Sequence, residues 1–429
     1  MDKELFKKEI KANCICWYDF KAESKVLIIG EEAIELKKAL THKGCMVKSI
    51  QEASLPSEKF DYIIVKDKLE ILSKAKKLLN EYGIIIFLAN NKNGLANIAS
   101  NKDKYTKQEI EKYLKKLKFN SYKFFYPLSN YEQANAIFSD DCLPEYNNSK
   151  LLNNVFYDDE TVIKYNEIES IKHVTKAGKF IDYTNSYIIE INNKSDINFI
   201  SFNNSRNEEY RLVTKVYKDK VVKEPANEKA EIHIAQIKEN MEVLKDMGFN
   251  ILDTYQDGNI ISKFVAGKTL YEEIIDLIYS RKIEEAFSAL KGWYEYIKSK
   301  CLNSTETYID LVLENTFYRN GEYLFFDQEW KLKNAPLEFI LYRTINNIYI
   351  YNPEIATIIA KEECWKLFDI DSTKIEEFKE CEKQFQNDVV NKELVQTYDI
   401  EYREKYKNVE PFKFYIKENF FRKILSKLK

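Results

Sequence analysis

Residues 25–30, Lys-Val-Leu-Ile-Ile-Gly, form an apolar run that ends in glycine and precedes a helical stretch at residues 31–43. Further strand-like runs follow at 44–50, 60–65 and 83–88, the last two separated by a second helical stretch. Strands that alternate with helices at this spacing predict an α/β doubly wound domain with a parallel sheet. A ligand of such a sheet lies beyond the carboxyl ends of its strands.

The ends of the first two predicted strands carry a family resemblance. Gly30 is followed by two glutamates, and the second strand ends near Gln51 and Glu52. Residues 20–130 resemble the class I S-adenosylmethionine-dependent methyltransferases, a Rossmann-like family in which a glycine turn approaches the cofactor and an acid binds its ribose. The resemblance implies that Gly30 and Glu52 would contact S-adenosylmethionine. Because glutamates stand where that family has glycine, we expect a degenerate methyltransferase-like domain.

Later phrases in the chain indicate a second domain. They are Asn-Gly-Leu at 93–95, Ser-Asp-Asp-Cys-Leu-Pro at 139–144 and Asn-Ser at 185–186. Together they resemble bacterial two-domain proteins of glycan-assembly clusters, which join a methyltransferase-like N-terminal domain to a protein-kinase-like C-terminal domain. The resemblance implies a methyltransferase-like domain at 1–145, a connecting segment at 146–195, a kinase-like domain at 196–370, and a helical C-terminal region with a basic amphipathic tail at 371–429.

The region after residue 196 has the pattern expected for the start of a kinase-like domain. Strand-like runs at 198–202, 210–217 and 220–223 precede a helical stretch at 227–247 with apolar residues on one face. Three antiparallel strands followed by one long helix open an α+β protein-kinase-like fold. Taken alone, this portion fits any α+β domain equally well.

The strongest chemical signal lies between residues 308 and 330. Asp310 and Asn315 have the Asp-x-x-x-x-Asn spacing of a kinase catalytic loop, and Asp327 ends an apolar strand after a turn. Phosphoryl transfer needs a carboxylate to receive the acceptor proton and oxygen ligands for Mg²⁺. We therefore expect Asp310 to be the base, Asn315 and Asp327 to be metal ligands, and Glu329 to be a second metal ligand. The alternative is a plain β-hairpin with solvated acids.

A cation for the phosphates is expected at Lys223, which closes the last of the three strands. In a kinase its partner is a carboxylate on the following helix, and Glu228 and Glu231 are the candidates. The chain has no glycine-rich loop before the second strand, but Arg206 lies in that turn and offers a bidentate donor for phosphate. For Lys223 and Arg206 alike, surface solvation is the alternative.

Composition excludes several classes of protein. A net charge of −3 argues against a nucleic-acid partner, and three histidines exclude a histidine-rich metal site. Seven scattered cysteines are typical of a reducing compartment. Without a signal peptide or a long apolar run, we expect a cytoplasmic protein. The basic amphipathic residues 411–429 predict contact with the inner face of a membrane or with a partner protein.

These features together predict a phosphotransferase that uses ATP and Mg²⁺ on a hydroxyl group. The resemblance supplies the acceptor class, a sugar, glycan or other small hydroxyl compound of surface- or flagellar-glycan modification. Two alternatives stay open. One is an active methyltransferase whose kinase-like half only binds substrate, and the other is a non-catalytic adaptor in glycan assembly.

Overall fold

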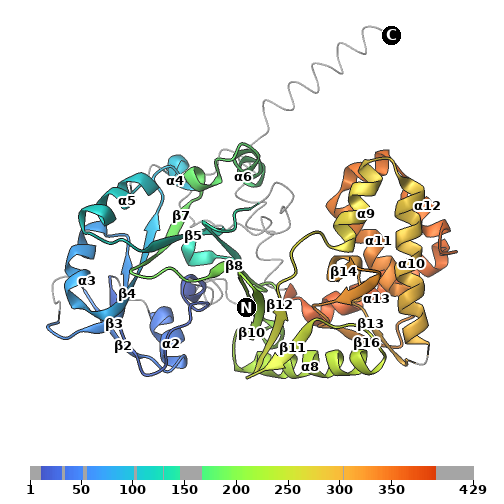
Figure 1. Ribbon diagram of the computed structural model, residues 1–429, viewed down its shortest axis with the longest axis horizontal. Helices are drawn as coiled ribbons and strands as arrows, with labels where there is room; N and C mark the ends of the chain where they lie inside the picture. The colour runs from blue at the N-terminus through green and yellow to red at the C-terminus, as the bar shows by residue number, and fades with distance from the viewer. Residues whose placement is uncertain are drawn as a thin grey trace, which may run out of the picture. The chain divides into compact units, whose positions relative to one another are not determined.

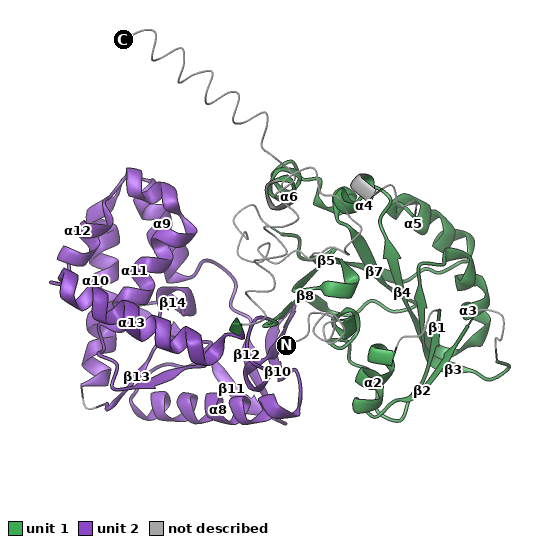
Figure 2. Cartoon of the chain, turned by 180° about the vertical axis from the view of Figure 1, so that it is seen from behind, with its two compact units in different colours: residues 1–204, 392–429 green, residues 205–391 purple. Residues whose placement is uncertain are grey.

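The computed structural model divides the chain into two compact units, coloured separately in Figure 2: unit 1 comprises residues 1–204 and 392–429, and unit 2 residues 205–391. Each unit is described by itself. The structure describes residues 11–30, 34–51, 56–100, 104–128, 130–144, 167–302 and 304–392.

Unit 1 is built on one mixed sheet with the strand order β8-β6-β5-β7-β4-β3-β1-β2 (Figure 1). Strands β2, β1, β3 and β4 are parallel, whereas β5, β6, β7 and β8 pair antiparallel with their neighbours. The parallel quartet confirms the predicted α/β fold of this half. The strands are β1 (Lys25–Ile29), β2 (Met46–Ile50), β3 (Phe60–Lys66), β4 (Leu79–Asn90), β5 (Tyr122–Leu128), β6 (Ala136–Ser139), β7 (Ser186–Ile191) and β8 (Ile197–Phe202).

Both faces of this sheet are covered, as a doubly wound fold requires. Alternate residues of β1, β3 and β4 pack on one face with apolar residues of α3, α5, α6 and α7. Aromatic side chains of the segment before β1 pack on other residues of the sheet. For example, the ring centroids of Trp17 and of Phe125 on β5 are 4.8 Å apart. The helices are α2 (Ile34–His42), α3 (Leu72–Leu78), α4 (Leu95–Ser100), α5 (Lys107–Lys116), α6 (Glu167–Lys176) and α7 (Phe180–Tyr183).

The structure differs from the predicted boundaries around residues 146–195. Strand β7 begins at Ser186, where the Asn-Ser pair indicated a strand, but it lies between β4 and β5 inside the sheet, and all six of its residues are buried. This part of the predicted connecting segment therefore belongs to the core of unit 1. Strand β8, expected to open the kinase-like domain, also belongs to unit 1, where it pairs with β6.

Unit 2 has an α+β architecture. An antiparallel sheet in the order β11-β12-β10-β9 packs against α8 and is followed by a largely helical region with two small two-stranded sheets, the hairpin β14-β15 and the pair β13-β16. The first part comprises β9 (Leu212–Tyr217), β10 (Lys220–Pro225), α8 (Glu231–Asp246), β11 (Asp253–Gln256) and β12 (Asn259–Lys263). The second comprises α9 (Leu270–Tyr279), α10 (Ile283–Cys301), β13 (Glu306–Tyr308), β14 (Thr316–Arg319), β15 (Glu322–Phe325), β16 (Lys331–Lys333), α11 (Phe339–Tyr351), α12 (Lys361–Lys366) and α13 (Ser372–Val389).

Helix α13 was expected in a separate C-terminal region, but the structure places it in unit 2. Phe378, Phe385 and Val389 of this helix are buried in the apolar core that α10 and α11 also build. A helix with such an apolar stripe is stabilised by burying it. The predicted tail at 411–429 lies outside the described residues. In the part of the chain that is described, no helix is both long and apolar enough to cross a bilayer.

The place of β7 in the core predicts the outcome of a stability measurement. Ile189 is 0% exposed, so Ile189→Ala should lower the free energy of unfolding of unit 1 by about 2–4 kcal/mol through lost burial and a cavity. Ile34→Ala is the control, because Ile34 is 51% exposed and its loss should change stability by less than about 0.5 kcal/mol. Urea unfolding of both variants measures the difference. Equal effects would contradict an interior position for β7.

Candidate functional site

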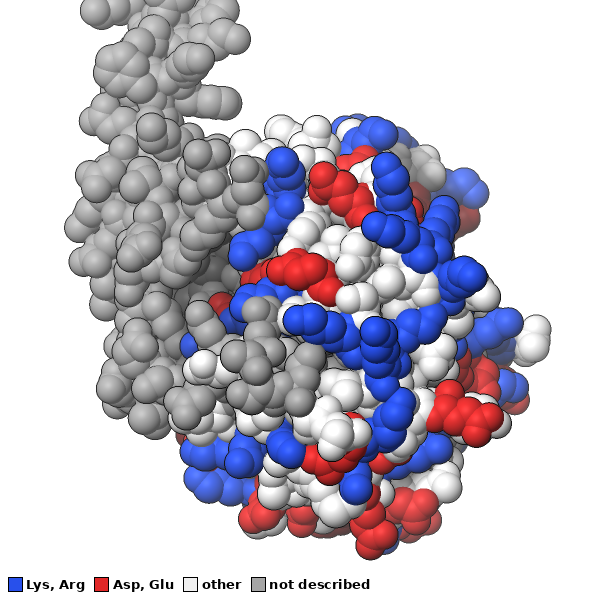
Figure 3. Space-filling model, turned by 90° about the vertical axis from the view of Figure 1, so that its left-hand side faces the viewer, with Lys and Arg blue, Asp and Glu red and all other residues white. Residues whose placement is uncertain are grey.

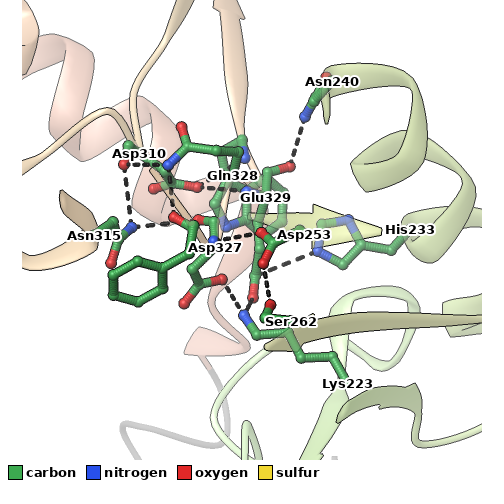
Figure 4. A network of polar contacts seen from close by, with 12 residues as sticks. Lys223, His233, Asn240, Asp253, Ser262, Asp310, Asn315, Asp327, Gln328 and Glu329 are labelled. Atoms are coloured by element: carbon green, nitrogen blue, oxygen red, sulfur yellow. Dashed lines mark hydrogen bonds and ion pairs between the residues drawn. The ribbon is translucent and has the colours of Figure 1, made fainter. Parts of the chain in front are cut away.

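Six of the residues singled out in the sequence converge within unit 2, and Figure 4 labels all of them except the arginine. Lys223 comes from β10, and the catalytic-loop pair comes from the segment between β13 and β14. The two remaining acids follow β15, and the arginine precedes β9. The six are Arg206, Lys223, Asp310, Asn315, Asp327 and Glu329.

Lys223 finds its acidic partners in the segment after β15. Its Nζ forms ion pairs with Asp327 and with Glu329, the latter at 2.5 Å. The predicted partners on the helix are wrong: Glu231 is exposed at the start of α8, and Glu228 lies in the short turn before it. Because the carboxylates reach Lys223 from another hairpin, no local spacing could indicate the pair.

Two carboxylates share this lysine, and they titrate differently. Burial raises the pKa of Asp327 to about 7, although Lys223 opposes the rise. Burial also acts to raise the pKa of Glu329, but Arg206 and Lys223 hold it well below its usual range. Glu329 is therefore the ionised partner at neutral pH, and Asp327 is the group that exchanges its proton there.

Basic and polar side chains from several elements surround Glu329. Arg206 Nη1 lies 2.6 Å and His233 Nε2 3.6 Å from its carboxylate, and Asn240 donates to its backbone carbonyl at 3.0 Å. The sequence assigned Glu329 to a metal and Arg206 to phosphate. In this structure the two bind each other at the wall of the polar cavity, and Glu329 connects the segment before β9, strand β10 and helix α8.

The backbone of Asp327 is held by a residue that sequence reasoning missed. Asp327 has φ 60°, a left-handed conformation unusual for a residue other than glycine. The carboxylate of Asp253, 1% exposed at the start of β11, accepts the Asp327 N–H at 2.7 Å and the hydroxyl of Ser262. In the sequence, the signal for this role is an acid that directly follows the apolar pair Ile251-Leu252.

Asp310 and Asn315 hold the segment between β13 and β14 against the segment between β15 and β16. One oxygen of Asp310 accepts the backbone N–H groups of Glu329 and Trp330 at 2.9 and 2.8 Å, and the other lies 3.2 Å from Arg343. Burial raises the pKa of Asp310, and Arg343 lowers it in part. The Asn315 amide donates to the backbone carbonyls of Asp310 and Asp327, at 3.1 and 3.3 Å.

Two cavities meet at Asp327. A polar cavity of about 280 Å³ is lined by Arg206, Asp310, Asn315, Glu329 and Arg343. A mainly apolar cavity of about 250 Å³ lies on the side of Lys223 and Asp253. Its apolar lining consists of Val221, Ile237, Leu252, Ile260, Phe264, Val265, Phe317 and Phe326.

The end of α13 closes one wall of the polar cavity. Asn207 N–H donates to the Val389 carbonyl, Asn391 N–H donates to the Ser205 carbonyl, and the Asn207 side chain donates to the Asp388 carbonyl, each at 2.9 Å. Phe385 and Val389 line the cavity beside these bonds. The wall therefore tethers the C-terminal helix of unit 2 to the segment before β9.

The donor set around Asp327 suits a magnesium ion bound together with a nucleotide. Within the described ranges, no group of three or more His, Cys, Asp or Glu side chains is arranged to hold a metal alone. Asp327 and Asn315 supply a carboxylate and an amide, and Mg²⁺ takes one or two protein oxygens beside phosphates and waters. The residues fit a nucleotide-bound metal and not an independent metal centre.

The predicted cofactor residues of unit 1 are only partly described. Gly30 ends β1 with φ 145°, and a side chain added there would meet only Cβ of Lys66, at 3.8 Å. Glu52 lies outside the described residues. Beyond β3, Asp67 accepts the N–H of Asn90 and the hydroxyl of Tyr131, at 2.8 and 2.9 Å. Sequence reasoning missed Asp67, although it follows the apolar end of a predicted strand.

Comparisons with known proteins give limited likenesses. No family model matches the sequence, and no curated protein matches it. Similar solved structures include phosphoethanolamine N-methyltransferase 2 of Haemonchus contortus, 13% identical with TM-score 0.25, covering 44% of this chain and 52% of that one. They also include the plantazolicin methyltransferases BpumL and BamL, each 9% identical, with TM-scores 0.23 and 0.21, covering 44% of this chain and 84% and 85% of theirs. All three contain S-adenosylhomocysteine.

The position of Glu329 predicts a large stability effect. Glu329→Gln leaves Lys223 and Arg206 buried without their shared counter-charge, so the free energy of unfolding of unit 2 should fall by about 3–5 kcal/mol. Glu376→Gln removes an exposed ion pair with Lys379 on α13 and should cost less than about 1 kcal/mol. Denaturant unfolding compares the two. A loss at Glu329 no larger than at Glu376 would contradict the anchoring role.

Proposed function

We propose that unit 2 binds a nucleoside triphosphate with Mg²⁺ and transfers its terminal phosphoryl group to the hydroxyl of a small acceptor. The observation that carries this proposal is the gathering of Lys223, Asp310, Asn315 and Asp327 around two cavities, a polar and an apolar one, that share Asp327 in their linings. Kinase-like enzymes use these residue types, in this chain order, for phosphate, base and metal. The succession of small sheet, helix α8, helical region and hairpins supports the same class.

The roles follow from the position of each group. Lys223 would hold phosphate oxygens, and Asn315 and Asp327 would hold the metal, which neutralises charge on the phosphates. Asp310 faces the polar cavity and would take the proton of the acceptor hydroxyl as its oxygen bonds to phosphorus and the nucleoside diphosphate leaves. Arg343, 3.2 Å from Asp310, would keep this carboxylate oriented and ionised.

The size of the polar cavity supports a small acceptor. At about 280 Å³, with α13 forming one wall, it has room for a compound of about the size of a single sugar. Its polar groups suit a polyhydroxyl compound, such as a sugar or the end of a glycan. This preference agrees with the glycan context that the family resemblance implies.

A second candidate function is binding of S-adenosylmethionine by unit 1, with methyl transfer as the activity. The observation that favours it is Gly30, which directly follows β1 with φ 145°, a conformation that favours glycine, at the edge where doubly wound sheets bind ligands. Fold likeness alone does not carry this candidate. A non-catalytic adaptor would bind neither nucleotide nor S-adenosylmethionine.

Nucleotide binding tests the main proposal. ATP with Mg²⁺ should raise the melting temperature of unit 2, because a ligand that binds only the native state stabilises it. Lys223→Met and Asp327→Asn should each weaken binding at least about tenfold, since each removes a charge-assisted contact. Calorimetric titration of folded variants measures the affinities.

Asp276→Asn is the matched control for this titration, because Asp276 forms an exposed ion pair with Lys268 away from the site. It should bind ATP as the wild type does. A titration in which S-adenosylmethionine binds and ATP does not would favour the second candidate. If neither ligand binds, the adaptor remains.

The affinity for the nucleotide should depend on pH through Asp327. Its pKa is raised to about 7 by burial, and a carboxylate must lose its proton to bind a metal. Affinity should therefore be weak below pH 7 and rise about tenfold between pH 6 and pH 8, the range over which Asp327 becomes ionised. Magnesium in large excess keeps the nucleotide itself ionised during the titration. A flat profile would contradict metal binding by Asp327.

A further inference from the structure

One face of unit 1 carries a concentration of lysines that the site in unit 2 does not use. Helices α3 and α5, with the residues that flank them, present eight exposed lysine side chains, here called the α3–α5 lysine face. Figure 3 shows basic side chains, all of them lysines in this part of the chain, spread over this end of the unit. The eight are Lys59, Lys74, Lys76, Lys77, Lys112, Lys115, Lys116 and Lys118.

Hydrogen bonds show that these lysines form one surface. The Nζ of Lys76 on α3 donates to the backbone carbonyl of Leu117 at the end of α5, at 2.6 Å. The Nζ of Lys59 donates to the carbonyls of Lys77 and Leu79, the latter at 3.3 Å. The ends of α3 and α5 and the start of β4 are therefore in contact.

The charge of this face is not neutralised by ion pairs among the residues of the unit that the structure describes. None of the eight lysines forms an ion pair with a carboxylate of the residues that the structure describes, whereas nearby Lys48 pairs with Glu58 at 2.6 Å and Lys107 with Asp140 at 2.9 Å. Five acids lie on or beside the same elements, so the face keeps an excess of three positive charges (eight lysines minus five acids). These acids are Asp61, Glu70, Glu81, Glu109 and Glu111, and Glu58 is left out of the count because it pairs with Lys48.

We propose that the α3–α5 lysine face docks on an anionic lipid surface. The whole chain has a net charge of −3, so attraction to such a surface must come from a local excess like this one. Residues 1–205 contain no arginine. Phosphates at fixed positions, as in nucleic acid, favour the rigid fork of arginine, whereas flexible ammonium groups suit mobile lipid headgroups.

An exposed aromatic residue beside the face supports this choice. Tyr82 is 85% exposed on β4, three residues beyond the Leu79 carbonyl that Lys59 contacts. Tyrosine is enriched at membrane interfaces, because its ring is apolar and its hydroxyl remains hydrated. This face shares no residue with the segment 411–429.

Binding to vesicles tests this proposal with the full chain. Near an anionic surface each lysine strengthens partitioning by about fivefold at low salt. Lys→Gln at positions 76, 77, 115 and 116 should therefore lower the partition coefficient for phosphatidylcholine–phosphatidylglycerol vesicles by roughly a hundredfold or more. Wild type should bind these vesicles, release them at high salt, and not bind vesicles of phosphatidylcholine alone. Co-sedimentation measures the bound fraction.

A matched variant controls for net charge. Lys→Gln at positions 282, 291, 298 and 383 removes four exposed lysines of unit 2 and should leave vesicle binding close to wild type. Unchanged melting temperatures show that both variants fold. Three outcomes would each overturn the proposal. The first is equal vesicle binding by the two variants, which would place the contact elsewhere, such as at 411–429. The others are no vesicle binding by wild type, and binding of an oligonucleotide instead of vesicles.

Discussion

The ion pairs of Lys223 with Asp327 and Glu329 connect the small sheet of unit 2 to the segment after β15, and the site depends on this connection. Buried charges are unfavourable unless they are paired and hydrogen-bonded, and here Arg206, His233 and Asn240 complete the partners of Glu329. The cluster therefore fixes how the strand of Lys223 faces the catalytic-loop segment. The main effect of such a buried network is to select one arrangement of the strand and the segment that it joins. Its net contribution to the free energy of unfolding is smaller.

The same cluster separates two tasks between two acids. Glu329 is ionised and bound to cations, so it holds the structure, whereas Asp327 is left with a pKa near neutrality and with cavities on both sides. Asp253 supports Asp327 from β11 by accepting its backbone N–H. A carboxylate kept in place by its backbone, with its side chain at the junction of two cavities, is well suited to meet a metal-bound nucleotide.

Much of unit 1 could be predicted because its signals are local. The apolar runs of β1, β3 and β4 and the glycine at residue 30 are visible in short windows, and they gave the parallel part of the sheet. The position of β7 could not be predicted in this way, because a strand's neighbours in a sheet are chosen by contacts distant in sequence. The residue types at 310, 315 and 327 were also visible from spacing alone. The partners Asp253 and Arg343 were not, since they reach the site from other elements.

The sequence by itself determined the parallel strands of unit 1, the first strands of unit 2 with helix α8, and the oxygen-bearing residues at 310, 315 and 327, because these depend on periodicity and short spacing. Only the tertiary structure decided that Glu329 is the partner of Lys223, that α13 closes the polar cavity, and that unpaired lysines gather on α3 and α5. The physical reason is that ion pairing and burial depend on distance in space, and residues 100 positions apart in the chain become neighbours only when the whole unit has folded.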